Sequence, residues 1–400
     1  MEIRRFTLDD HEASYRLAVE AFGSSPGGVP PRPAALPEGR EVWLALVDGD
    51  LAARVAAHSY ESWWHGVRVP TCGVASVAVA PERRGAGLLR PLFAAMLAAG
   101  AERGDVVSTL YPTANGIYRP LGYEVVTSFD TVRLATAELA GVRAPSGSTT
   151  VRRAGVDDLP AMTAVYDAWA AAQNGPLNRT GPRFARSPQE LLDDVTAVSL
   201  AVEGDRVVGF ASWDRGEGYD PATASLEVHD LVAVTADGYR ALWRMLGTHT
   251  SVAGTVRLHT SGDDPARWVL PTATWDVVAR HPYMLRVHDP AAAFGAVSGP
   301  AHLAGATVPF RVVGDPLGVA DGDYRLDLDG ATGAASCERA DGLGGQDVAT
   351  YTMSGLALAW SGAQSCANLR HAGHLSGPST HDRLLDALLR SRPLHVRDYF

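Results

Sequence analysis

The feature that most constrains the fold of this chain is an internal repeat. The segment IRRFTLDDHEASYRLAVEAF begins at Ile3, and VRRAGVDDLPAMTAVYDAWA begins at Val151. Each gives an apolar residue, an Arg-Arg pair and then an Asp-Asp pair before a run with helical spacing, and acidic residues there cap and stabilise a helix N-terminus. In the same order, Asp48-Gly49 and Glu203-Gly204 stand between β-rich runs as hairpin turns. The sequence therefore predicts two copies of one α+β unit.

The organisation of the whole chain follows from this repeat. We place the first copy at residues 1–145 and the second copy at 150–285, with the linker from Gly141 to Thr150. Beyond them come the short alternating runs YRLDLDG, ASCERA and TYTMSGLALAWSG, then THDRLLDALLRS with helical spacing, and LHVRDYF as a last strand candidate. Residues 286–400 are therefore predicted to form a third α+β domain, and the expected fold class is α+β (mixed α/β) throughout.

Composition excludes several classes of function. All 35 basic residues are arginine, so the chain can form neither a Schiff-base lysine nor a GxxxxGK[ST] phosphate loop. The formal charge of −10 disfavours a nucleic-acid partner and mildly favours cationic ligands. Three cysteines argue against a disulfide framework and a four-thiolate zinc site. Because no apolar run is long enough for a membrane span or a signal peptide, we expect a cytoplasmic protein without membrane partners.

The stretch SVAVAPERRGAGLLRPLF, from Ser76 to Phe93, joins the end of a predicted strand to the start of a predicted helix. Pro81 ends the strand, and the N–H groups of Gly85 to Arg90 come to the helix N-terminus, where free donors and the helix dipole favour a diphosphate. The glycines allow a ligand to approach the backbone closely. The dinucleotide fingerprint GxGxxG fails, because Arg90 stands where its third glycine belongs. A solvated turn before a surface helix is the alternative reading.

Two signatures in this region resemble those of the Gcn5-related N-acetyltransferases. The first resembles the acetyl-CoA motif V-x-V-x-P-x-x-R-G-x-G-x-[GA], although Leu89 replaces its last small residue; the matching residues are Val77, Val79, Pro81, Arg84, Gly85 and Gly87. The second, STLYPTANGIYRPLGYE, resembles the N-x(n)-Y-x-x-x-G-[FY] signature, with Tyr118 at its tyrosine. With the repeat, the third domain and the terminal Phe400, the whole chain resembles the Eis (enhanced intracellular survival) family of these acetyltransferases.

This resemblance implies a fold, a reaction and residue roles. It implies tandem acetyltransferase folds, the second degenerate, followed by a sterol-carrier-like domain, and a homohexamer. The implied activity is acetyl-CoA-dependent acetylation of a small-molecule amine, such as an aminoglycoside-like polyamine, without a metal. Tyr118 would protonate the departing thiolate, and the terminal carboxylate of Phe400 would be the general base. The implied cofactor-binding residues are Val77, Ala78, Val79, Arg84, Gly85, Ala86, Gly87, Leu88, Leu89, Arg90, Thr113 and Ala114.

Alternatives remain for the function and for both catalytic residues. The acceptor could instead be a protein lysine or a small amine. The alternative outside the enzymes is a non-catalytic regulator that binds acyl-CoA or a lipid. Tyr118 would then be a core tyrosine, and Phe400 would end an ordinary strand. In the second copy, Asp237 to Leu242 replace the glycine and arginine pairs, so we predict no diphosphate there and a role as packing partner and pocket wall.

The remaining candidates are weaker. Trp63-Trp64-His65 and Phe22 could line a substrate pocket or belong to the core. The Pro/Gly-rich segment from Gly23 to Gly39 reads as a lid or as a surface loop. Tyr111 and Tyr123 are expected to pack in the core. Loose ligand-like spacing in a predicted loop gives little reason to expect a metal; the residues concerned are His371, His374 and Cys366.

Overall fold

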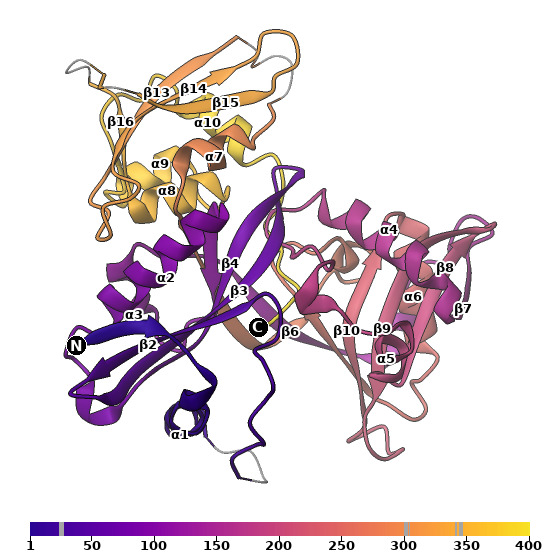
Figure 1. Cartoon of the computed structure of the whole chain (residues 1–400). Coiled ribbons are helices and arrows are strands. Elements are labelled where there is room, and N and C mark those ends of the chain that lie inside the picture. Colours follow the sequence, from indigo (N-terminus) through magenta and orange to yellow (C-terminus); the bar gives the residue numbers. More distant parts are fainter. Residues whose placement is uncertain (24–27, 300–302, 304, 341, 344–346) are drawn as a thin grey trace.

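The structure is a computed structural model that describes residues 1–400 apart from 24–27, 300–302, 304, 341 and 344–346. Figure 1 shows the first copy in indigo and purple, the second copy beside it in magenta and pink, and the third domain above the first copy in orange and yellow. The yellow C-terminal segment runs back from the third domain to the junction of the first two copies. The end of the chain therefore lies between the copies and far from the helix that precedes it.

The elements of each part follow the order that the sequence predicts. The first copy contains β1 (Glu2–Arg5), α1 (His11–Phe22), β2 (Arg40–Val47), β3 (Asp50–Trp64), β4 (Val67–Val79), α2 (Leu89–Arg103), β5 (Val107–Leu110), α3 (Asn115–Tyr118) and β6 (Glu124–Ala135). The second copy contains β7 (Thr150–Arg153), α4 (Leu159–Ala170), α5 (Pro188–Asp193), β8 (Ala197–Glu203), β9 (Arg206–Arg215), β10 (Ser225–Ala233), α6 (Ala236–Gly247), β11 (Thr255–Thr260) and β12 (Asp276–Val287).

The third domain contains α7 (Pro290–Gly295), β13 (Thr307–Val313), β14 (Gly322–Leu328), β15 (Ala335–Ala340), β16 (Ala349–Thr352), α8 (Met353–Trp360), α9 (Cys366–His371), β17 (Leu375–Ser376) and α10 (Asp382–Leu389). Its strands form a separate sheet in the order β15-β14-β13-β16-β17, and the helices lie between this sheet and the first copy (Figure 1). The predicted mixed α+β class is confirmed for all three parts. Within the described residues, no helix is both long and apolar enough to cross a bilayer.

The second aspartate of each repeated acidic pair makes equivalent hydrogen bonds and ion pairs in the two copies. The Asp10 carboxylate accepts the N–H of Thr7 at 2.7 Å and pairs with the Arg4 guanidinium at 2.7 Å. Asp158 accepts the N–H of Gly155 at 2.9 Å and pairs with Arg152 at 2.6 Å. Each carboxylate thus satisfies a free donor at the turn that opens the following helix, as predicted. The hairpin turn at Asp48-Gly49 is also confirmed, with left-handed φ angles of 56° and 91°.

The two copies exchange strands and share one sheet. Its order is β1-β2-β3-β4-β5-β12-β6-β11-β10-β9-β8-β7. β12, from the end of the second copy, lies between β5 and β6 of the first, and β6 in turn pairs with β11 of the second. The predicted boundary at residue 285 therefore falls inside a strand that completes the first copy.

The third domain is packed firmly against the first copy. The Arg286 guanidinium donates to both carboxylate oxygens of Asp315, at 2.8 and 2.9 Å, and to the carbonyl of Leu121 at 2.9 Å. Both charged side chains are fully buried. The Trp64 and Trp360 rings, from β3 and α8, lie 4.9 Å apart. Strand β12 leads directly into this domain, so one continuous core joins the two parts.

Two predicted strands are wrong. In TYTMSGLALAWSG only the first three residues are strand, as the end of β16 (Ala349–Thr352), and Met353–Trp360 is helical. The Thr352 hydroxyl accepts the N–H of Gly355 at 3.1 Å and so caps a helix that is buried on most sides, which hides its period. LHVRDYF forms no strand and makes only one isolated bridge, between Asn174 and Leu394. Its charged side chains bind the second copy instead of lying along a sheet edge.

Candidate functional site

The first copy contains a pair of parallel strands that separate. β4 and β5 pair from Thr71–Val107 to Gly73–Thr109. β4 then continues to Val79 with no partner on that side among the described residues, while its other edge stays paired with β3. Ser76 has a φ of 51°, and the register of β3 against β4 shifts beside it. This bulge bends β4 and helps to direct it away from β5.

The unpaired edge presents backbone donors and acceptors to the opening. The N–H of Ala80 donates to the carbonyl of Ala52 on β3 at 2.9 Å. Because successive residues of a strand direct their polar groups to opposite edges, those of Val77 and Val79 face the opening. An extended ligand with amide groups can therefore pair with β4 as another strand would.

The loop after β4 brings further free donors to the same end of the strand. Gly85 and Gly87 have φ angles of 80° and 74°, and the space where a Cβ would stand is open at both. The helix α2 has no side-chain cap, and its third residue is Pro91. The backbone N–H groups that lack an acceptor among the described residues belong to Gly85, Gly87, Leu88, Leu89 and Arg90. This group of donors, with Arg84 exposed beside it, fits a diphosphate.

The matching helix in the second copy is closed to an anion. The Thr235 hydroxyl caps α6 by accepting the N–H of Gly238 at 3.0 Å. The Asp237 carboxylate lies at the same helix start and accepts the N–H of Ser146 at 2.9 Å. A capped helix with a carboxylate at its first turn repels phosphate, in agreement with the prediction for this copy.

Tyr118 lies on the short helix α3 that follows β5. Its ring packs 6.1 Å from the Phe93 ring of α2 and 6.4 Å from that of Tyr123. The side chain is 5% exposed, and this burial raises its pKa to about 12. Its hydroxyl has no partner in the described part of the chain, whereas that of Tyr123 bonds to Ser108 at 2.5 Å. Tyr118 is therefore a neutral phenol with a donor to offer.

The C-terminal residue reaches the point where β4 and β5 separate. A Cβ built on Gly73, the last paired residue of β4, would lie 2.9 Å from the Phe400 ring. The Phe400 ring also packs 5.2 Å from that of Tyr60 on β3 and 5.5 Å from that of Tyr111 after β5. These contacts hold the Phe400 ring beside the strands of the first copy where β4 and β5 separate.

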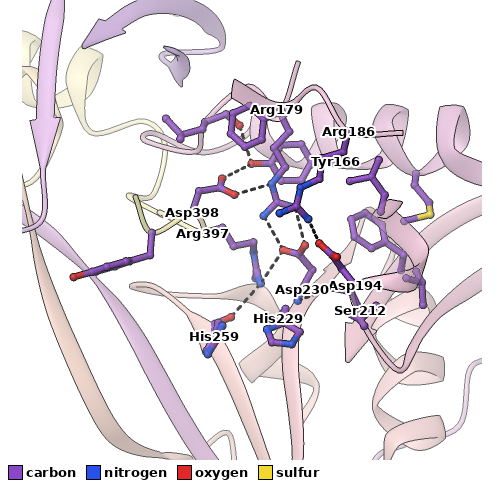
Figure 2. A pocket seen from close by; sticks show the side chains of 18 of the residues that line it. Tyr166, Arg179, Arg186, Asp194, Ser212, His229, Asp230, His259, Arg397 and Asp398 are labelled. Carbon is purple, nitrogen blue, oxygen red and sulfur yellow. Dashed lines mark hydrogen bonds and ion pairs between the residues drawn. The ribbon is translucent and has the colours of Figure 1, made fainter. Parts of the chain in front are cut away.

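A cavity of about 1050 Å³ adjoins the C-terminus (Figure 2). Its walls come mainly from α4, the segment from Leu177 to Val195, β9 and β10 of the second copy, and Tyr60, Phe129 and Phe400 close the side toward the first copy. The charged residues that line it are Asp167, Asp194, Asp214, Asp230, Asp398, Arg179, Arg183, Arg186 and Arg397. The second copy is thus a pocket wall, as the sequence predicted.

Ion pairs organise one side of this cavity, as Figure 2 shows. Arg179 binds both oxygens of Asp230, at 2.6 and 3.0 Å, and its Nε donates to Asp398 at 3.0 Å. Burial favours a neutral Asp230, but the charge of Arg179 outweighs it and lowers the pKa of Asp230. For Asp398 burial prevails and raises the pKa despite the same arginine. Arg179 itself stays charged between the two carboxylates, which raise its pKa although burial opposes them.

The structure brings most of the sequence-predicted residues together along this opening. Val77, Ala78 and Val79 lie on β4, and the implied residues from Arg84 to Arg90 form the loop and the first turn of α2. The exposed Thr113 and Ala114 lie between β5 and α3. The residues that sequence analysis missed are those that hold the C-terminal segment, above all Arg179, Arg397 and Asp398. The signal for this role in the sequence is the Arg397-Asp398 pair, which directly precedes the two terminal aromatic residues.

The weaker candidates lie elsewhere. Trp64 and His65 are buried, with the His65 ring 2.9 Å from the Trp360 carbonyl, and Phe22 is 54% exposed. None of them lines the cavity. Of the predicted lid, residues 24–27 lie outside the described part of the chain. Cys366 and His371 belong to a helix, and no three potential metal ligands cluster among the described residues.

Comparison with known proteins agrees with this geometry. Residues 2–126 match one acetyltransferase (GNAT) domain family and residues 175–287 match a second family of the same description. The N-acetyltransferase Eis of Mycobacterium tuberculosis is 29% identical over 266 residues, which are 60% of this chain and 62% of that protein. An uncharacterized N-acetyltransferase of Streptomyces avermitilis is 28% identical over 359 residues, covering 82% of this chain and 80% of its own.

Solved structures extend the similarity to the entire chain. A GCN5-related N-acetyltransferase from Kribbella flavida has a TM-score of 0.82 at 28% identity and covers 100% of this chain and 98% of its own. Eis1 from Mycobacterium abscessus has a TM-score of 0.77 at 23% identity over 100% of both chains, a likeness of fold. The chain thus carries two acetyltransferase domains of the GNAT superfamily. Within that superfamily, its sequence is similar to that of the N-acetyltransferase Eis.

The glycines of the loop allow a direct test of the donor cluster. Gly85→Ala places a Cβ in open space, so its cost is the strain of a positive φ, about 1–2 kcal/mol. We expect the loop to relax, the donors to lose their alignment and KM for acetyl-CoA to rise about tenfold with little change in kcat. Gly104→Ala is the matched control, because Gly104 ends the same helix with a φ of 87° and open space. An equal KM for the two variants would disprove the assignment of the loop.

Proposed function

We propose that the protein is an acetyl-CoA-dependent N-acetyltransferase that acetylates amino groups of a polycationic small molecule. The observation that carries this proposal is the opening between β4 and β5, which has free backbone groups along β4, uncapped α2 at one end and the C-terminus at the other. The two domain matches and the Eis-like similarity support the same reaction.

The residues present fit acetyl-CoA as co-substrate. The donors from Gly85 to Arg90 would bind the diphosphate, and Val77 and Val79 would pair with the pantetheine amides. Bound there, acetyl-CoA supplies a thioester as the acetyl donor. Free backbone N–H groups of β4 also stabilise negative charge on a carbonyl oxygen in the opening.

Tyr118 and Phe400 supply the proton transfers. A thiolate leaving group, whose parent thiol has a pKa near ~8.5 by analogy with cysteine, needs a proton as it departs. The Tyr118 phenol is neutral at physiological pH and donates from its hydroxyl. The terminal carboxylate of Phe400 orients the acceptor ammonium and removes its proton, directly or through water. It has no ion-pair partner among the described residues, so it is free for this role.

The cavity supports a large cationic acceptor. Its volume of about 1050 Å³ lies at the upper end of the usual range for small-molecule sites. Asp167 and Asp214 line it without an arginine partner in the described structure, although Asp214 bonds to His229 at 2.8 Å. With the terminal carboxylate they favour an amine-rich molecule such as an aminoglycoside-like polyamine.

A panel of acceptors tests this proposal. Thiol release from acetyl-CoA is measured with an aminoglycoside, a linear polyamine, a lysine-containing peptide and a simple monoamine. We expect the highest kcat/KM for the aminoglycoside or polyamine. Selective turnover of the peptide would redirect the proposal to protein lysine. CoA binding without turnover on any member would favour a non-catalytic regulator.

Other features rest on the family resemblance and belong to the same proposal. They are assembly as a homohexamer, a sterol-carrier-like third domain and a cytoplasmic location. Light scattering on the purified protein measures its oligomeric state, and a dimer or a monomer would disprove the proposed homohexamer.

The raised pKa of Tyr118 gives a pH prediction. An ordinary tyrosine has a pKa of about 10, so at about pH 10 half of the protein molecules would have lost the hydroxyl proton that the reaction needs. With its pKa raised to about 12, Tyr118 remains protonated there. We therefore expect kcat to rise as the acceptor amine deprotonates and then to stay level through about pH 10. A kcat profile that falls with an apparent pKa near 10, in protein shown to remain folded, would contradict this environment.

A further inference from the structure

The second copy has an opening of its own between parallel strands. β10 and β11 pair from Ser225–Thr255 to Val228–Leu258. β10 then continues to Ala233, as β4 continues past its pairing with β5 in the first copy. The repeat aligns SVAVAP with DLVAVT, so Leu231 stands where Val77 stands in the first copy. This second opening is therefore the counterpart of the proposed pantetheine site.

The side chain of Arg397 fills this second opening. Its Nη1 donates to the carbonyl of His259 on β11 at 3.2 Å, and its Nη2 to the carbonyl of Leu231 on β10 at 3.4 Å. The guanidinium thus bridges the two separating strands. It also pairs with Asp264 at 2.8 Å, and both side chains are fully buried. The Trp169 ring of α4 lies 5.0 Å from the guanidinium carbon.

We propose that the opening of the second copy is a socket for the C-terminal segment, and that Arg397 is the positioning residue that holds the Phe400 carboxylate in place. The proposal rests on the proposed function of that carboxylate. The proposal also assigns a role to the degenerate copy. Thr235 and Asp237 close the N-terminus of α6, and the opening between β10 and β11 binds the C-terminal segment instead of a cofactor.

The residues between Arg397 and the C-terminus are also held by contacts with both copies. Asp398 is held by Arg179 through its side chain and by the Tyr111 hydroxyl, which donates to its carbonyl at 2.7 Å. The Tyr399 ring packs 4.4 Å from that of Tyr111. Only three residues separate Arg397 from the terminus, a reach of at most about 10 Å, so anchoring Arg397 limits where the carboxylate can lie. Contacts from both copies thus converge on this segment.

The test compares Arg397→Met with Arg390→Met. Arg390 is an exposed residue beyond α10 and serves as the matched control. Two quantities are measured on the full chain: the rate at which a carboxypeptidase releases Phe400, and the split between kcat and KM for acetyl-CoA. In Arg397→Met we expect Phe400 to be released at least tenfold faster and kcat to fall by about 100-fold, because small displacements of a reacting group cost that much. KM for acetyl-CoA should change little, and Arg397→Lys should recover part of kcat.

The outcomes separate this proposal from the proposed function. Release of Phe400 at the rate of Arg390→Met, with an equal kcat, would overturn the socket. Fast release with an unchanged kcat would support the socket but show that the terminal carboxylate is not the base. Loss of kcat with Phe400 still protected would overturn the positioning role of Arg397. If Arg397→Met does not fold, Arg179→Met replaces it with the same readouts, since Arg179 is partly exposed and holds Asp398.

Discussion

A chain whose C-terminal carboxylate is replaced by a carboxamide is expected to lose turnover by about 10²–10⁴-fold, the usual contribution of a general base. The terminal amide keeps the size and the aromatic contacts of Phe400 with Tyr60 and Tyr111 but cannot accept the proton of the acceptor. The change is made by ligation of an amidated C-terminal peptide, and kcat is measured at saturating acetyl-CoA. The affinity for CoA should stay within about twofold, because the diphosphate donors of α2 lie at the other end of the opening.

Two controls make this result specific. The same ligation with a natural carboxylate controls for the procedure, and a tri-glycine added before the exposed Met1 controls for chain extension as such. Tri-glycine after Phe400 should be at least as damaging as the amide, since it moves the terminal carboxyl group three residues away from Phe400, whose ring lies beside Gly73. A carboxamide protein with full kcat would exclude the terminal base and leave proton removal to another group or to water.

Tyr118→Phe is expected to lower kcat by about 10²–10⁴-fold while the affinity for CoA stays nearly constant. The substitution removes one hydroxyl and keeps the ring that packs against Phe93. Because that hydroxyl has no partner among the described residues, its removal breaks no internal hydrogen bond and the stability should hardly change. Stopped-flow thiol release separates the chemical step from product release, and calorimetric titration gives the affinity for CoA.

Tyr123→Phe is the matched control for this variant. Tyr123 lies in the same aromatic cluster and is fully buried, but its hydroxyl bonds to Ser108 at 2.5 Å. Its loss should cost about 1 kcal/mol of unfolding free energy and leave kcat within a few fold. An unchanged kcat in Tyr118→Phe, or equal losses in the two variants, would show that Tyr118 is a core residue without a role as acid.

Local patterns in the sequence predicted much of the proposed site. The residues from Val77 to Arg90 are contiguous, so the strand, the glycine loop and the helix N-terminus follow from neighbouring residues alone. The repeat likewise predicted that the second copy would lose this arrangement, and the capped helix at Thr235 agrees. Patterns failed where burial hides the period, as in Met353–Trp360, and where an extended segment has no strand partner, as at LHVRDYF.

The sequence by itself thus determined the duplicated α+β plan, the caps of the repeated helices and a strand–loop–helix unit whose free backbone donors fit a diphosphate. Only the tertiary structure decided the exchange of β6 and β12 between the copies, the pocket and the insertion of Arg397 between β10 and β11. The physical reason is the range of the interactions. Caps, turns and helix periods depend on residues a few positions apart, whereas the Arg397–Asp264 pair joins groups 133 positions apart. Such a contact forms only because the whole fold brings the groups together and excludes water from them.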